Sequence, residues 1–311
     1  MDSEPGYLRL LQSGELEKRA ERAWQILESC RLCPHECGVN RLDGETGFCR
    51  IGELAVVASY GAHFGEEPPL IGPPGRRKGS GTVFFSGCNL SCIYCQNYDI
   101  SQHAEGRALP PEFVAAFFLS LQEEGCLNIN LVTPTHVMPQ ILKALLLAAG
   151  EGLRLPVVYN CGGYESVETL RLLDGIVDIY MPDFKYSDDG IARELSKAPG
   201  YWKHARAAFK EMHLQVGDLV IEQGVARRGL LVRHLVLPGG LSGYEKIFRF
   251  LAEELSADTF INIMDQYRPC WKAFERPPLD RRITSEEFKD ALEAARRAGL
   301  RRVMQFMDMG W

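Results

Sequence analysis

From residue 80 onward, short apolar runs alternate with longer segments of helical periodicity. The apolar runs predict strands at 82–86, 128–132, 156–159, 176–181, 230–237, 259–264 and, more briefly, 302–306. The segments between them predict helices at 110–124, 137–149, 166–173, 189–216, 242–255 and 284–298. Apolar strands that alternate with helices are typical of a parallel sheet whose outer face is covered. The pattern therefore predicts an α/β fold.

Several of these helices carry recognisable end signals. Pro110 opens the first, Ser166 is suited to be an N-cap, and Thr284 begins a Thr-x-x-Glu capping pattern. The segment 189–216 is interrupted at Pro199 and the glycine that follows it. These signals support six strand–helix units.

Six such units make three quarters of an eight-unit barrel, so we expect a partial (β/α)6 barrel of the TIM type. A Pro- and Gly-rich stretch, 68–81, precedes it. We therefore expect an N-terminal helix and metal-binding region over 1–79 and the barrel over 80–311. Functional residues of such barrels lie at the carboxyl ends of the strands.

Composition excludes some partners. The 311 residues include 35 Lys and Arg against 41 Asp and Glu, and this net charge of −6 gives no basic footprint for nucleic acid. No run approaches the roughly 20 apolar residues that span a bilayer, and the first residues do not resemble a secretory signal. Ten cysteines in clustered spacings then suggest metal ligands in a reducing cytoplasm.

Cys88, Cys92 and Cys95 form a tight Cys-x3-Cys-x2-Cys loop after the first barrel strand. Three thiolates hold only three irons of a four-iron cluster, so the fourth iron is open to substrate. A structural zinc knuckle is the alternative. Cys126, Cys161 and Cys270 stand alone, as buried cysteines commonly do, although the last two follow barrel strands.

This loop, within the longer run 79–102, resembles the signature of the radical S-adenosylmethionine (SAM) enzymes, and in particular the pyruvate formate-lyase-activating-enzyme-like proteins. The resemblance implies a [4Fe–4S] cluster whose open iron binds SAM and reduces its sulfonium. Methionine and a 5′-deoxyadenosyl radical result, and the radical takes a hydrogen atom from a substrate. An electron donor such as flavodoxin or ferredoxin is implied as a partner.

Four more cysteines precede the barrel, namely Cys30, Cys33, Cys37 and Cys49. Four sulfurs match a closed tetrahedral Zn²⁺ site, which is our first interpretation. A second iron–sulfur cluster is the alternative, because four cysteines also suit iron–sulfur chemistry. His35 lies inside this segment and could replace one cysteine as a ligand.

The resemblance and the strand-end rule together select contacts for SAM. By resemblance, Tyr94 would contact adenine. After the second strand, Thr135 and His136 could supply hydrogen bonds where many relatives have Gly-Gly-Glu-Pro. Asn160, after the third strand, resembles the Thr-Asn-Gly type of turn of activating enzymes, and His234 on the fifth strand could hold SAM or be a satisfied core residue.

Two further strand ends supply candidates. Asp183 and Lys185 match the Asp-x-Lys motif of activating enzymes, in which the Asp helps hold a monovalent cation and the Lys reaches the ligand. A structural ion pair is the alternative. Gln266 and Tyr267, after the sixth strand, are candidates to meet substrate at the open mouth.

Three functions follow from this pattern. The first is an activase that places a glycyl radical on a partner enzyme, and the second is a radical SAM enzyme that modifies a small molecule or a peptide. The third is a metal-binding redox or scaffold protein without enzymatic activity. The sequence specifies neither the hydrogen atom that is taken nor the oligomeric state.

Overall fold

The computed structural model describes residues 4–307 and confirms the α/β fold built on a mainly parallel sheet. The ten strands follow the order β10-β9-β8-β6-β5-β4-β2-β1-β3, with β7 paired to β8. Their bounds are β1 Ala55–His63, β2 Ser80–Phe85, β3 Arg107–Leu109, β4 Ile129–Val132, β5 Val157–Cys161, β6 Ile179–Pro182, β7 Val220–Glu222, β8 Val225–Leu235, β9 Phe260–Met264 and β10 Arg302–Val303.

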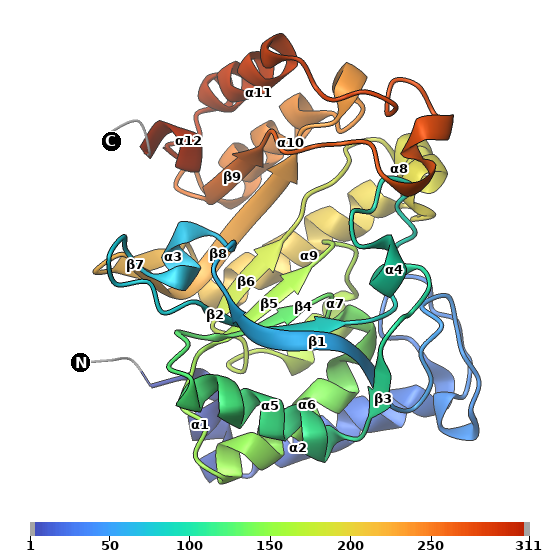
Figure 1. Ribbon diagram of the computed structural model, residues 1–311, viewed down its shortest axis with the longest axis vertical. Coiled ribbons are helices and arrows are strands. Elements are labelled where there is room, and N and C mark those ends of the chain that lie inside the picture. The colour runs from blue at the N-terminus through green and yellow to red at the C-terminus, as the bar shows by residue number, and fades with distance from the viewer. Residues whose placement is uncertain (1–3, 308–311) are drawn as a thin grey trace.

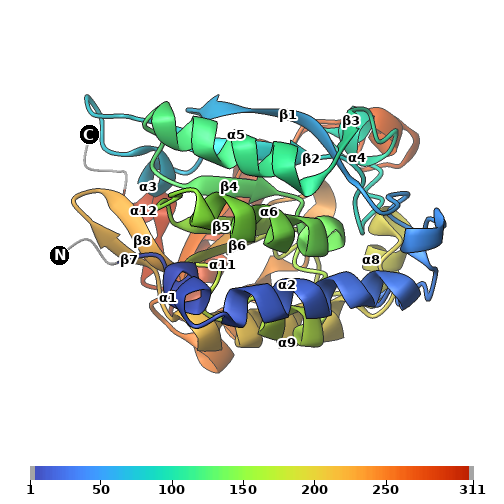
Figure 2. The same cartoon turned by 90° about the horizontal axis from the view of Figure 1, so that it is seen from below.

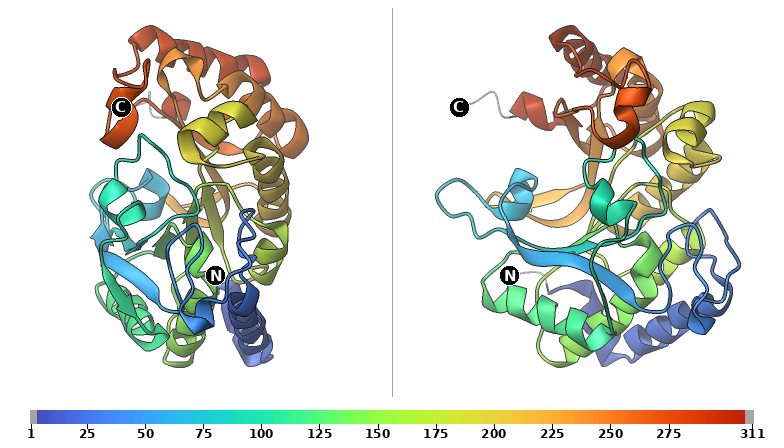
Figure 3. Two further views of the ribbon diagram at one scale, coloured as in Figure 1. Left: turned by 90° about the vertical axis from the view of Figure 1, so that its right-hand side faces the viewer. Right: turned by 45° about the vertical axis from the view of Figure 1, so that its right-hand side comes forward.

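All neighbouring pairs from β2 to β10 along this order are parallel. The outermost strands, β10 and β3, do not pair with each other, so the sheet curls without closing into a full barrel (Figures 1 and 3). The result is the predicted partial barrel, with a Cys-rich segment before it.

Helices cover the outer face of the sheet. Figure 2 shows α5, α6 and α2 side by side over the strands, and α7 packs between α2 and α9. Figure 1 shows α10 and α11 over β9. The longer helices are α1 Gly6–Gln12, α2 Glu15–Gln25, α5 Pro111–Glu123, α6 Met138–Gly150, α7 Val167–Leu172, α8 Asp189–Ser196, α9 Tyr201–Val216, α10 Tyr244–Phe250 and α11 Ser285–Ala298. The shortest are α3 Pro68–Ile71, α4 Tyr98–Ser101 and α12 Met304–Met307. None of the helices between residues 4 and 307 is long and apolar enough to cross a membrane.

Alternation along the strands gives the sheet two faces. Side chains such as Tyr159 and Tyr180 belong to the large core under the helices, whereas Val158 and Ile179 belong to a smaller core inside the barrel. Leu70 of α3 joins this inner core. The inside of the barrel is therefore apolar along the strands, and polar residues begin at their carboxyl ends.

The structure adds one long strand that the apolar pattern did not predict. β1 pairs antiparallel with β2 from Val57 to His63, with a bulge, and β3 pairs antiparallel with β1. Because β1 lies before residue 79, the predicted domain boundary falls between two strands of one sheet. At the other end, the strand predicted over 302–306 is β10 alone, since Met304–Met307 is helical.

The N-terminal residues run along the helical layer toward the site. α1 and α2 pack against α6, and the chain then forms loops with two 3-10 turns, η1 Ile26–Ser29 and η2 Arg41–Asp43. In Figure 1 these blue loops lie near α4, on the side toward which the arrows of β4, β5 and β6 point. The four-cysteine segment therefore lies at the carboxyl ends of the parallel strands.

Candidate functional site: a cysteine loop at the carboxyl ends of the strands

The loop with Cys88, Cys92 and Cys95 follows β2 directly, and its sulfurs are unpaired. Each sulfur has a neighbouring hydrogen-bonding group. The Leu90 backbone N–H donates to Cys88 Sγ at 3.3 Å, and Ser196 Oγ donates to Cys92 Sγ at 3.0 Å. Cys95 Sγ lies 3.1 Å from the hydroxyl oxygen of Ser101. Such hydrogen bonds to sulfur tune the potential of iron–sulfur clusters.

Neighbouring elements hold the backbone of this loop. The N–H groups of Ser91 and Ile93 donate to the carbonyls of Ser196 and Leu195 at the end of α8, at 2.8 and 2.9 Å. The amide of Asn89, which is buried, donates to the Tyr164 carbonyl at 2.6 Å. The position of the loop therefore depends on two other strand–helix units.

Four polar side chains meet inside the barrel mouth. Asp183 accepts from Lys185 Nζ at 2.8 Å and from Arg233 Nε at 2.8 Å, and Arg233 also donates to Asn160 Oδ1 at 2.7 Å. The charged side chains are only 18 to 20% exposed. Burial alone would raise the pKa of Asp183, but Arg233 and Lys185 hold it below its usual value.

Lys185 connects this network to the cysteine loop. Burial raises the pKa of the Cys88 and Cys92 thiols, and the Lys185 charge opposes that rise in both. A cation near these sulfurs favours the thiolate, which is the form that binds a metal. The network and the loop thus form one site.

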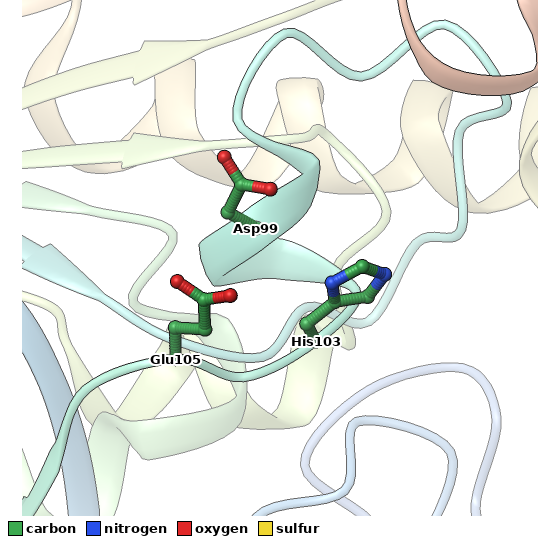
Figure 4. Close-up of side chains that lie close together, drawn as sticks. All are labelled: Asp99, His103 and Glu105. Carbon is green, nitrogen blue, oxygen red and sulfur yellow. The ribbon is translucent and has the colours of Figure 1, made fainter.

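The spacing of the sulfurs fits a cluster better than a single ion. Among residues 4–307, Asp99, His103 and Glu105 are the only set of three or more potential ligands whose atoms all lie within 4.8 Å of one another. Figure 4 shows this exposed trio around α4. The loop cysteines are spread more widely, as expected when each binds a different iron of a [4Fe–4S] cluster.

Comparison with known families decides the class of the protein. The family model of the radical SAM superfamily matches residues 82–251, which run from β2 to the beginning of the turn after α10. The chain belongs to the radical SAM superfamily. Membership implies a [4Fe–4S] cluster and SAM, and the cysteine loop described above fits that cluster.

Two uncharacterized proteins of Methanocaldococcus jannaschii are similar over nearly the whole radical SAM chain. One is 35% identical over 302 residues, which cover 94% of this chain and 82% of that protein. The other is 23% identical over 297 residues, which cover 90% and 80%. The similarity therefore includes the N-terminal segment.

Solved structures are more distant. A radical SAM methyltransferase from Sphaerobacter thermophilus has a TM-score of 0.47 and 17% identity, with 72% of this chain and 65% of that chain covered. TYW1 with a lysine-pyruvate adduct bound has a TM-score of 0.43 and 11% identity, with 70% and 72% covered. Streptococcus suis SuiB bound to its precursor peptide SuiA has a TM-score of 0.42 and 14% identity, with 70% and 46% covered.

Two predicted aromatic contacts of the radical SAM site are buried. Tyr94 is 6% exposed, and its hydroxyl lies 2.5 Å from that of Tyr186, which in turn bonds to Ser196. Tyr267, predicted at the open mouth, is 1% exposed and donates to the Leu279 carbonyl at 2.6 Å, because the chain after β9 folds back over it. Its hydroxyl is thus already used inside the protein.

Three further candidates for SAM binding also make internal hydrogen bonds, although the buried Nδ1 of His136 has no partner among the described residues. Thr135 Oγ1 donates to Glu165 at 2.7 Å, and His136 Nε2 lies 2.7 Å from the Ser86 carbonyl. His234 is fully buried, with its two ring nitrogens 2.7 Å from the Phe184 carbonyl and 3.1 Å from a serine hydroxyl. The satisfied-core interpretation of His234 therefore fits these contacts.

Gln266 remains exposed, and its backbone carbonyl accepts from Gln96 Nε2 at 3.5 Å, just after the cysteine loop. Sequence reasoning selected His234 and passed over its neighbour Arg233, which points the other way, into the barrel. It also missed Glu67, which is buried, accepts from Asn262 at 2.8 Å and lies near enough to Arg233 for their charges to interact. Strand alternation is the signal that could have distinguished residues 233 and 234.

Proposed function

We propose that the chain cleaves SAM reductively at a [4Fe–4S] cluster held by Cys88, Cys92 and Cys95. The cluster supplies the electron and an open iron for SAM, and the resulting 5′-deoxyadenosyl radical takes a hydrogen atom from a substrate. The proposal is carried by one observation. Three unpaired thiols and a buried network of opposite charges meet at the carboxyl ends of parallel strands.

The polar residues of the barrel mouth would each have a separate role beside the cluster and SAM. Lys185 offers a cation beside the thiolates, and Asn160 and Arg233 offer polar atoms inside the mouth. Asp183 orients both cations. Since these cations already neutralise its carboxylate, the monovalent cation expected there stays a prediction, as do the SAM contacts of Tyr94, Thr135 and His136.

For the substrate, we favour a glycine of a partner enzyme, as the resemblance of the run 79–102 to activating enzymes suggests. An open sheet is compatible with a protein loop entering the mouth. Modification of a small molecule or peptide is the second candidate. A flavodoxin or ferredoxin as electron donor also stays a prediction.

The test begins with the protein reconstituted with iron and sulfide without oxygen, reduced, and given SAM. We expect 5′-deoxyadenosine from the wild type and none from Cys92→Ala. The matched control is Cys126→Ala, because Cys126 is a buried cysteine that lies beside Gly81 at the start of β2, whereas the loop follows the other end of that strand. Equal product from the wild type and Cys92→Ala would overturn the proposal.

A second measurement addresses the substrate. A purified glycyl-radical enzyme such as pyruvate formate-lyase is added to the active mixture, and its electron paramagnetic resonance (EPR) spectrum is recorded. A stable radical on that partner, absent with Cys92→Ala, supports the activase. Turnover of SAM without a partner radical favours a small molecule or peptide.

A further inference from the structure

The cysteines of the N-terminal segment enclose a pocket of their own. Cys30, Cys33, Cys37 and Cys49 line it, and all four are free thiols. The remaining wall is formed by Leu32, Glu36, Arg41, Gly47, Phe48 and His136. Phe48 also donates its backbone N–H to Cys37 Sγ at 3.4 Å. A pocket walled by four thiols in this way is built for a metal centre.

The separation of these sulfurs argues against the zinc ion that the sequence first suggests. Zinc binds cysteine sulfur at about 2.3 Å, so two ligands of one ion can be no more than about 4.6 Å apart. Within the described residues, no three of these four sulfurs lie within 4.8 Å of one another. The three loop cysteines give the same result. In every set of three, at least one pair of sulfurs is therefore farther apart than 4.8 Å, as suits a four-iron cluster in which each cysteine binds a different iron.

A buried charge points to a metal centre with net negative charge in this pocket. Arg41 is fully buried and donates only to backbone carbonyls, to Gly52 at 2.9 and 2.7 Å and to His136 at 2.7 Å. Buried cations are normally paired with negative groups, and the ion pairs found between residues 4 and 307 give Arg41 no carboxylate. Because Arg41 lines the pocket, metal-bound thiolates there would supply the missing negative charge.

This pocket lies directly against the first cysteine loop. His35 Nε2 is 3.0 Å from the carbonyl oxygen of Asn89, which follows Cys88. A Cβ on Gly87 would lie 2.6 Å from the Cys49 carbonyl oxygen, so only glycine fits between the two segments. The backbones that carry the two sets of cysteines are therefore in contact.

We propose that Cys30, Cys33, Cys37 and Cys49 hold a second [4Fe–4S] cluster rather than zinc. With four cysteine ligands it has no open iron, so it serves electron transfer beside the SAM-binding loop. The inference rests on the proposed function in one respect only, namely that the neighbouring loop with Cys88, Cys92 and Cys95 holds the cluster that binds SAM. Metal binding at the four cysteines is testable by itself.

The test measures iron and zinc in protein reconstituted without oxygen. The decisive variant replaces the three cysteines of the loop after β2, as Cys88→Ala with Cys92→Ala and Cys95→Ala, and is called the triple variant. We expect it to keep about four irons per chain, against about eight in the wild type, and no stoichiometric zinc. The complementary variant, Cys33→Ala with Cys49→Ala, is expected to keep about four. One zinc and no iron in the triple variant would overturn the inference.

If the triple variant fails to fold, the wild type alone decides. About eight irons support the second cluster, whereas about four irons with one zinc refute it. EPR of the reduced wild type adds a further readout, since SAM should change the signal of one cluster and leave the other as it was. Failure to form 5′-deoxyadenosine with about eight irons present would contradict the proposed function and not the second cluster.

Discussion

Replacing Arg233 by Met tests whether the charge network in the barrel mouth holds the fold as well as the site. Met keeps the apolar stem and removes the two hydrogen bonds, to Asp183 at 2.8 Å and to Asn160 at 2.7 Å. Hydrogen bonds to charged groups contribute about 1.5–3 kcal/mol each. Lys185 still pairs with Asp183, so Asp183 is not left as an unpaired buried charge. Glu67, whose pKa burial raises and Arg233 lowers, can take up a proton when Arg233 is removed. With two such bonds removed, we expect the free energy of unfolding to fall by about 3 kcal/mol.

Urea unfolding followed by circular dichroism measures this change. The matched control is Arg301→Met, because Arg301 also pairs with an aspartate, Asp258, in two hydrogen bonds, but these side chains are 66% and 44% exposed. Exposed pairs are worth about 1 kcal/mol or less. Equal losses in the two variants, or a loss below about 1 kcal/mol in Arg233→Met, would refute the argument from burial.

The pH dependence of the same pair gives an independent check. The native pKa of Asp183 lies below its ordinary value of 3.8, so its stabilisation is present above that value and is lost as pH falls through the native pKa. The difference between wild type and Arg233→Met should therefore shrink in acid. A constant difference from pH 7 to about pH 2 would contradict the ion pair as its cause.

Three other changes have defined outcomes in urea unfolding. Burial raises the pKa of Glu165 from 4.5 to about 7, so the contribution of this group should lower stability by about 3 kcal/mol as pH rises through this interval. Burial also raises the pKa of Asp178, to about 6, so the effect of Glu165 is measured as the stability of the wild type minus that of Glu165→Gln, which should fall by about 3 kcal/mol. Gly163→Ala places a Cβ 2.5 Å from the Asp183 carbonyl oxygen, whereas Gly125→Ala meets no atom within 4 Å at a similar positive φ. Gly125→Ala should cost about 1–2 kcal/mol and Gly163→Ala distinctly more. Thr284→Ala removes an N-cap bond to the third residue of α11 and should cost about 1 kcal/mol. A pH-independent difference between the wild type and Glu165→Gln, equal costs of the two glycine changes, or an unchanged midpoint in Thr284→Ala would count against the respective argument.

The apolar runs predicted the parallel strands because each is buried on both faces and bounded by turn residues. The same pattern did not predict β1, because Ala55–His63 is apolar at its start but partly exposed beyond Val57. What makes it a strand is its pairing with β2, a contact between segments distant in the chain that no local pattern records. The α/β class was therefore readable from the sequence, and the antiparallel edge was not.

The cysteine spacings identified both sulfur sites because their ligands lie close together in the chain. The polar residues were harder to select. Which of Arg233 and His234 enters the barrel depends on the strand register, and a one-residue difference reverses the direction of the side chain. Glu67 and Asn262 meet from positions 195 residues apart. Their contact is a property of the folded barrel alone.

An open sheet has a cost that a closed barrel avoids, namely two edges with unpaired backbone groups that can template pairing with other chains. Here, because β3 pairs only with residues 55–57 of β1, the rest of β1 is an edge as well, but the outermost strands are short, with two residues in β10 and three in β3. Each carries an arginine, Arg302 and Arg107, and β10 leads at once into α12. The outermost strands are thus too short and charged to give another strand much to pair with, and a bulge between Val57 and Ser59 disturbs the regular backbone where β1 itself becomes the edge. Together these features let the barrel stay open with little risk of edge-to-edge aggregation.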